Sequence, residues 1–156
     1  MKKLLLFSFL FSIIFVSCSD DEETESPFPT FKFTVYECNM TSEKPTLELS
    51  QGVNISLFNE VDDNKNLVEK ITTDANGEAV FYGHINIWYY FLAEKNGAKN
   101  IIDRYVVNGI SSTGELKFKD INADGYVDEN DRTDYGGSIT NKELNITKEK
   151  TIYIAK

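Results

Sequence analysis

Apolar and polar residues alternate with a period of two along most of the chain beyond residue 30. Phe31, Phe33 and Val35 alternate with more polar neighbours, and the same alternation returns over residues 53–57. A period of two places successive side chains on opposite faces of a strand, whereas a helix requires a period near 3.6. The further predicted strands are residues 46–50, 67–73, 78–82, 87–94, 115–119, 144–147 and 151–155.

Stretches rich in Gly, Asn and Asp separate the predicted strands. Residues 59–66 are expected to form a long polar turn, residues 74–77 a turn that ends at a glycine, and residues 101–110 a strand or an extended loop. Short strands with turns of this composition are typical of a sandwich or barrel. Residues 31–156 are thus predicted to form one all-β domain, a Greek-key β-sandwich. Residues 87–94 would be its central strand, apolar on both faces.

Three stretches within residues 52–100 resemble the carboxypeptidase-regulatory-like, or transthyretin-like, family of β-sandwiches. They are residues 53–58, residues 73–81 with their Asn-Gly turn, and residues 88–94, which carry four consecutive aromatic side chains. This resemblance implies an extracellular accessory module and not an enzyme. A fold by itself does not fix a function, so the function has to be inferred from candidate site residues.

The clearest chemical signal is a loop over residues 120–131. A calcium loop of the EF-hand type supplies oxygen ligands at positions 1, 3, 5, 7, 9 and 12, with glycine at position 6. In this register Gly125 falls at position 6, where it permits a sharp bend. The predicted ligands are Asp120, Asn122, Asp124, the backbone carbonyl of Tyr126, Asp128 and Asp131.

Position 12 of this loop is an aspartate where the EF-hand has a glutamate, so the loop resembles the calcium loop of dockerin modules. A dockerin has two such loops, and this chain has one, so the resemblance carries over the ion site and not the dockerin partner. We expect calcium to play a structural role. The loop would be inserted before the last strands and would anchor its connection to the sandwich through Tyr126 and Val127. A solvated acidic turn without an ion and a magnesium site are the alternatives.

The first residues have the features of an export signal. A basic start is followed by an apolar run over residues 4–16, which is too short for a comfortable transmembrane helix and suits a signal peptide. A small residue directly before Cys18 resembles the lipobox of bacterial lipoproteins. It implies a signal peptide over residues 1–17 and a lipid on the Cys18 thiol. A soluble secreted protein is the alternative.

An acidic, proline-containing stretch over residues 18–30 follows and is predicted to be a lipidated tether. An acidic cluster after the lipidated cysteine resembles the surface-export signal of one group of Gram-negative bacteria. The expected location is therefore the outer membrane, with the domain exposed at the cell surface. The formal net charge of −9 argues against a nucleic-acid partner.

Other chemistry is sparse. Cys38 is expected to be a packed, inert thiol, and His84 a loop residue and not a base or a zinc ligand. No nucleophile elbow, phosphate-binding glycine loop or Cys/His metal spacing occurs in the sequence. The aromatic residues of the 87–94 strand have two interpretations. They form core packing, or Trp88 and Tyr90 provide an exposed surface on which sugars stack.

These observations predict a non-enzymatic protein. It would be a calcium-stabilised, surface-anchored lipoprotein that serves as a binding or assembly module, with the membrane as partner through Cys18 and with a protein or a glycan as its ligand. The alternatives are a glycan-binding accessory protein of an outer-membrane uptake system or, least favoured, a glycan-degrading enzyme with a pair of carboxylates.

Overall fold

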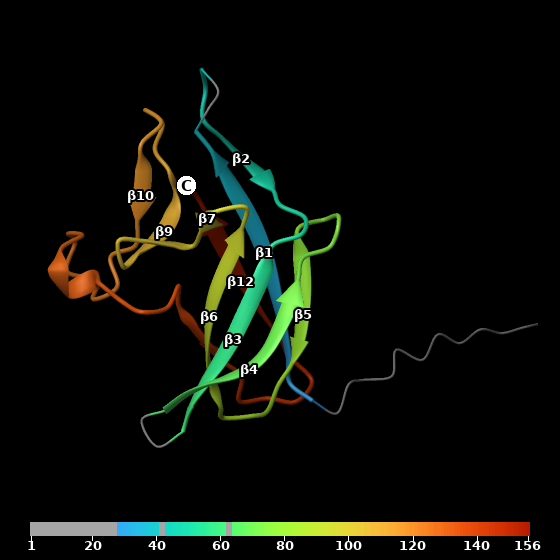
Figure 1. Cartoon of the computed structure of the whole chain (residues 1–156). Coiled ribbons are helices and arrows are strands. Elements are labelled where there is room, and N and C mark those ends of the chain that lie inside the picture. Colours follow the sequence, from blue (N-terminus) through green and yellow to red (C-terminus); the bar gives the residue numbers. More distant parts are fainter. Residues whose placement is uncertain (1–27, 41–42, 62–63) are drawn as a thin grey trace, which may run out of the picture.

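The computed structural model describes residues 28–40, 43–61 and 64–156, and these form an all-β structure (Figure 1). Two sheets pack face to face, and a smaller three-stranded sheet lies beside them. In the described residues no helix is long and apolar enough to cross a membrane. The all-β sandwich predicted from the two-residue period is confirmed. The signal peptide over residues 1–17, Cys18 and nearly all of the tether lie outside the described residues.

The first sheet is built around the strand predicted at residue 31. Strand β1 (Thr30–Asn39) pairs in parallel with β12 (Thr147–Ile154) on one side. On its other side it pairs antiparallel with β5 (Glu78–Tyr82) along its first half and β2 (Thr46–Leu49) along its second half. Because β1 has neighbours on both sides, its alternate residues are well placed for burial.

The second sheet has β6 at its centre, as predicted. Its strands, in spatial order, are β11 (Ser138–Thr140), β6 (Trp88–Lys95), β3 (Asn54–Val61) and β4 (Asn64–Thr72), and β7 (Ala98–Lys99) pairs with the end of β6. The smaller sheet contains β8 (Ile101–Ile102), β9 (Tyr105–Ile110) and β10 (Leu116–Phe118). A short 3₁₀ helix, η1 (Glu129–Asp131), ends the predicted calcium loop.

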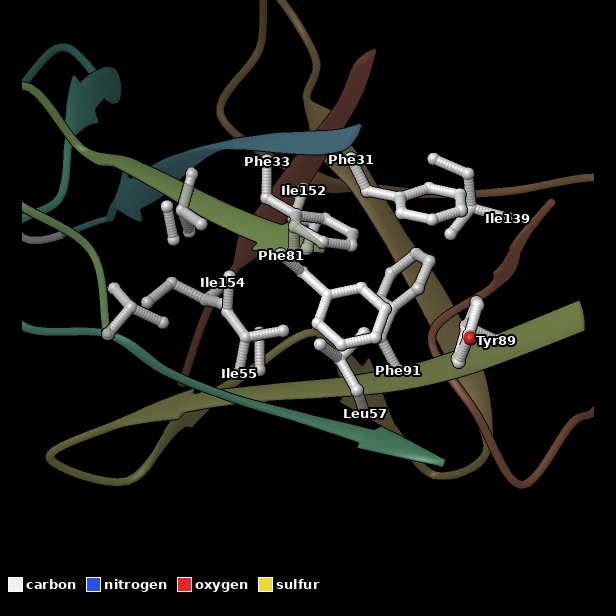
Figure 2. Packing of buried hydrophobic residues seen from close by; sticks show 14 of the residues in the cluster. Phe31, Phe33, Ile55, Leu57, Phe81, Tyr89, Phe91, Ile139, Ile152 and Ile154 are labelled. Atoms are coloured by element: carbon white, nitrogen blue, oxygen red, sulfur yellow. The ribbon is translucent and has the colours of Figure 1, made fainter. Parts of the chain in front are cut away.

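The core lies between the two large sheets and is rich in aromatic rings (Figure 2). Phe31 and Phe33 of β1 meet Tyr89 and Phe91 of β6 edge to face, with ring centroids 5.4 and 5.6 Å apart. Edge-to-face contacts bring the positive edge of one ring to the negative face of the other. The remaining buried residues of this cluster are Val35, Val53, Ile55, Leu57, Ala79, Phe81, Ala93, Ala98, Ile139, Ile152 and Ile154.

Several predicted boundaries were wrong. The polar region 59–66 is mostly strand, because β3 and β4 extend as a long hairpin to Val61 and from Asn64. Residues 101–110 form a hairpin that turns at Asp103 and Arg104, both with positive φ. Residues 144–146 are not a strand. The fully buried Asn141 side chain organises this loop by donating to the Ile146 carbonyl and accepting from the Glu143 N–H.

Strand β6 is central but is not apolar and buried on both faces. Tyr89, Phe91 and Ala93 are each about 1% exposed and face the core. On the opposite face Trp88 is 55% exposed and Tyr90 is partly buried. Because successive residues of a strand point to opposite faces, core packing accounts for only part of the aromatic run. Tyr89 and Phe91 pack the core, and Trp88 and Tyr90 lie on the outer face.

Candidate functional site

The 120–131 loop lies in the connecting segment, residues 119–137, between β10 and β11. Its short side chains turn inward onto its own backbone. Asp120 accepts hydrogen bonds from the backbone N–H groups of Ala123, at 2.7 Å, and Gly125, at 2.8 Å. Gly125 has φ +96°, which fits the sharp bend predicted at that position. Further bonds of the same kind join Asn122 Oδ1 to the Asp124 N–H, Asp124 Oδ1 to the Tyr126 N–H, and Asp128 Oδ1 to the Asn130 N–H.

Asp131 is the fully buried member of the loop. Its Oδ1 accepts from the N–H groups of Ile121 and Asn122, and its Oδ2 accepts from the N–H of Asp128 at 2.9 Å. The Asp128 N–H does most to lower the pKa of Asp131, burial opposes it, and the other two N–H groups lower the pKa further. The side chain therefore ties the two ends of the loop together as a carboxylate.

The predicted ligands have the atom types that calcium prefers, but the structure does not gather their side chains around one centre. Calcium prefers oxygen ligands, and every predicted ligand offers oxygen. A carboxylate oxygen that accepts one N–H can still bind a cation, which leaves Asp120 and Asp128 able to act as ligands. Asp131 Oδ1 already accepts two N–H groups. Within the described residues, no group of three or more His, Cys, Asp or Glu side chains comes together in a way that could hold a metal ion.

The predicted anchoring of this segment through Tyr126 and Val127 was wrong. Tyr126 is 75% exposed and Val127 is 45% exposed, so neither packs on the sandwich. The segment is attached after the loop instead. Thr133 donates its backbone N–H to the carbonyl of Arg104, and the Arg104 guanidinium pairs with Asp134 at 3.0 Å. Arg104 lies in the β8–β9 turn, where its φ is positive.

Tyr135 is the main apolar anchor. Only 9% of it is exposed, and the centroid of its ring lies 5.3 Å from the ring centroids of both Phe58 of β3 and Tyr90 of β6. Lys65 of β4 lies over the Tyr135 ring with its Nζ 4.5 Å from the centroid. We call Phe58, Tyr90 and Tyr135 the outer aromatic cluster. The sequence gives a weak signal for Tyr135, because the two glycines that follow it allow the chain to approach the sheet closely.

The outer face of the second sheet is hollowed around this cluster. A hollow of about 280 Å³ includes Trp88 and Tyr90 in its lining, and another of about 300 Å³ includes Tyr90, Tyr135 and Arg104. Both are lined by Glu60 as well, so they adjoin. The two predicted ligand-binding residues, Trp88 and Tyr90, therefore both lie on this face, and Tyr90 lines both hollows.

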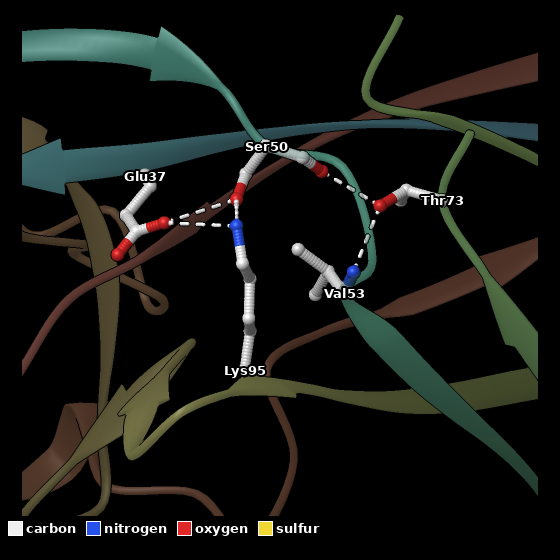
Figure 3. Close-up of polar contacts among 5 residues, drawn as sticks. All are labelled: Glu37, Ser50, Val53, Thr73 and Lys95. Carbon is white, nitrogen blue, oxygen red and sulfur yellow. Dashed lines mark hydrogen bonds and ion pairs between the residues drawn. The ribbon is translucent and has the colours of Figure 1, made fainter. Parts of the chain in front are cut away.

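A polar cluster of Glu37, Ser50 and Lys95 lies at the other end of β6 (Figure 3). Lys95 Nζ donates to the Ser50 hydroxyl at 2.9 Å, and that hydroxyl donates to Glu37 at 3.0 Å. A serine nucleophile would instead have to donate its proton to a neutral lysine. Lys95 also pairs with Glu37 at 3.4 Å. The Ser50 carbonyl accepts from the Thr73 hydroxyl at 2.6 Å, so the cluster joins segments that are far apart in the sequence.

The two other residues singled out in the sequence have ordinary positions. His84 is exposed in the loop after β5, and its backbone N–H donates to the Tyr89 hydroxyl at 2.9 Å. Cys38 is 5% exposed, and burial together with the charge of Glu37 raises the pKa of its thiol to about 11. Both predictions, a loop histidine and a packed thiol, are confirmed.

No known protein family matches this chain, and no curated protein matches it. Its function therefore has to be argued from its own residues.

Proposed function

We propose that this protein is a non-catalytic binding module that a lipid on Cys18 holds at the cell surface. The outer face of the second sheet supports this proposal best. Trp88 is 55% exposed on a rigid strand, with Tyr90 beside it on the same face, and adjoining hollows run along the two side chains. Aromatic side chains that line a hollow together with a few polar groups are typical of ligand-binding surfaces.

A glycan is the ligand that this face favours. The apolar face of a sugar ring stacks on flat aromatic side chains, and its hydroxyl groups bond to polar residues around them. Asn59, Glu60 and Asn86 supply such groups beside Trp88. Adjoining hollows suit a chain of sugars better than a single small molecule. The module would then serve as an accessory protein of an outer-membrane glycan-uptake system.

Affinity electrophoresis against a panel of neutral and acidic polysaccharides tests this proposal. We expect retardation of the full chain by at least one polysaccharide, and loss of that retardation in Trp88→Ala and Tyr90→Ala. Tyr82→Ala is the matched control, because Tyr82 is 58% exposed on β5 in the other sheet. Absence of retardation by every polysaccharide would show that the glycan assignment is wrong.

Calcium is proposed as a structural ion of the 120–131 loop. Asp120, Asn122, Asp124, Asp128 and Asp131 supply oxygen side chains in the required order, and Tyr126 supplies a carbonyl. The ion would cancel repulsion among these carboxylates and fix the connecting segment beneath the β8–β9 turn. It would have no part in a reaction.

Thermal unfolding with calcium and with a chelator tests the ion. Chelation should lower the melting temperature of the native chain, because an ion that binds only the folded state stabilises it by mass action. Asp120→Ala and Asp124→Ala should remove that response, and Asp74→Ala, in a turn outside the loop, should keep it. Identical melting of the native chain under both conditions would refute the calcium proposal.

The lipid anchor can be tested independently of the fold. Metabolic labelling with an alkyne fatty acid should label the native chain and Cys38→Ala, and should leave Cys18→Ala unlabelled in the soluble fraction. Surface proteolysis of intact cells then distinguishes the outer face of the outer membrane from its periplasmic face. A labelled Cys18→Ala chain would contradict the assignment of the anchor.

A further inference from the structure

A small basic pocket adjoins the outer aromatic cluster, at the seam between the sandwich and the connecting segment. Its volume is about 180 Å³, and Tyr90 and Tyr135 line it together with Lys119, Ser138 and Lys150. Lys119 directly follows β10 and precedes the 120–131 loop, whereas Lys150 comes from the middle of β12. Three segments that are far apart in the sequence thus converge here. We call it the lysine pocket.

The lysine pocket concentrates positive charge in an acidic protein. The chain has a formal net charge of −9, yet within the described residues no acidic side chain lines this pocket. Lys119 and Lys150 form no ion pair with a described residue. The other cations near the outer aromatic cluster differ in this respect, because Lys65 and Arg104 both pair with Asp134.

The two lysines are also close enough to act on one another. Burial lowers the pKa of Lys150, and the positive charge of Lys119 lowers it further. Like charges held together beside a partly buried cavity are unfavourable unless an anion neutralises them. Two ammonium groups together present several N–H donors to a single anionic group.

We infer that the lysine pocket receives the anionic group, a carboxylate or a sulfate, of an acidic glycan whose neighbouring sugar rings stack on the outer face of the second sheet. This inference rests on the proposed glycan-binding function and specifies its ligand class. Tyr90 connects the two parts of the site, since it lines the lysine pocket and both hollows beside the outer aromatic cluster. The same residue would then contact the sugar that carries the charge.

The test compares polymers that differ in charge alone. Polygalacturonate is compared with its methyl ester, and dextran sulfate with dextran, by calorimetry on the full chain. We expect the native chain to bind one charged polymer at least about tenfold more tightly than its uncharged counterpart, and to lose this preference at high salt. The two pairs of polymers distinguish a carboxylate from a sulfate.

The variant Lys119→Ala/Lys150→Met should remove the preference while leaving the fold intact, because methionine retains the apolar packing of the Lys150 stem. The control Lys142→Ala/Lys156→Ala removes two charges from outside the pocket and should keep the preference. Equal binding of charged and uncharged polymers, or an unchanged preference in the Lys119/Lys150 variant, overturns the inference but leaves glycan binding standing. Absence of binding to all four polymers overturns the inference, and the electrophoresis panel then decides whether the proposed glycan binding stands. Circular dichroism confirms that each variant is folded.

Discussion

The sandwich core and the connecting segment between β10 and β11 are stabilised by different kinds of contact. The core consists of apolar side chains from strands that are far apart in the sequence, such as Phe33 of β1 against Phe91 of β6. The 120–131 loop is instead held by bonds from its own side chains to its own backbone, most of them spanning two to five residues. The core is thus held by apolar contacts between residues far apart in the sequence, and the loop by hydrogen bonds between residues close in the sequence.

This difference predicts that truncating a side chain affects stability differently in the two regions. Removing a core ring leaves a cavity between the two sheets and destabilises the whole domain, because the surrounding side chains relax only in part to fill it. Removing a loop side chain frees backbone N–H groups near solvent, so its effect should remain local. The proposed binding surface lies at the boundary of the two regions, where Tyr135 of the connecting segment packs on Phe58 of β3 and Tyr90 of β6.

The largest effect is expected from Phe91→Ala. Phe91 is 1% exposed, and truncation of a buried aromatic ring costs about 3–5 kcal/mol. Chemical denaturation should show this loss both with calcium and with a chelator, since the ring belongs to the core cluster between the sheets. Trp88→Ala, three residues away and on the outer face, is the control and should change the free energy of unfolding by less than about 1 kcal/mol.

A smaller loss is expected where the two regions meet. A Cβ on Gly136 would lie 1.6 Å from the Nδ2 atom of the buried Asn100 side chain. Gly136→Ala must therefore displace Asn100, whose Oδ1 accepts from the Ala93 N–H of β6, and should cost about 1–3 kcal/mol. Gly97→Ala provides the comparison, because its Cβ meets no atom within 4 Å and only its φ of +86° is unfavourable. An equal loss in the two variants would show that steric contact with Asn100 is unimportant.

Asp131→Ala tests whether the loop is a local unit. It removes the acceptor of three backbone N–H groups, so protease cleavage within residues 119–137 should accelerate by about tenfold or more. Cleavage within the sandwich should not change. Glu129→Ala is the matched control, because Glu129 is an exposed residue of the same short helix and its side chain pairs with Arg132. Global unfolding of Asp131→Ala would mean that the loop and the sandwich are one cooperative unit.

The smallest effect concerns Cys38, in a second apolar cluster with Val107 and Ala155. Its thiol pKa of about 11 means that the reactive thiolate is scarce at neutral pH. Alkylation in the native chain should therefore be slow at pH 7 and should increase as the pH rises towards 11. Peptide mass spectrometry distinguishes this residue from Cys18. Rapid labelling at pH 7 in the folded chain would contradict the burial of Cys38.

Local patterns predicted most of the fold correctly. The alternation at Phe31, Phe33 and Val35 identified β1 and its buried face, and the Asn-Gly turn before β5 was placed correctly. Period-two patterning fails where a strand is very short. β11 has three residues with only Ile139 buried, which gives no recognisable repeat, whereas Leu144 and Ile146 alternate in the same way but are exposed in a loop.

The candidate site was predictable where it depends on residues that are close together in the sequence. The 120–131 loop was recognisable because its contacts are local and its residues are consecutive. Trp88 and Tyr90 were identified by residue type, but their outward orientation follows from which face β6 buries. Lys119 and Lys150 could not be identified beforehand, and Tyr135 had only the weak signal of the two glycines after it, because the path of the chain between β10 and β12 brings the three residues together.

The parallel pairing of β1 with β12 has a mechanical consequence. The chain enters β1 at Thr30, beside Thr147, and leaves β12 beyond Ile154, at the opposite end of an eight-pair ladder. A pull applied between the start of β1 and the end of β12 would load that ladder in shear, so that its hydrogen bonds share the force and do not open one after another. If the proposed tether holds the chain before β1, such a ladder would resist traction along these two strands.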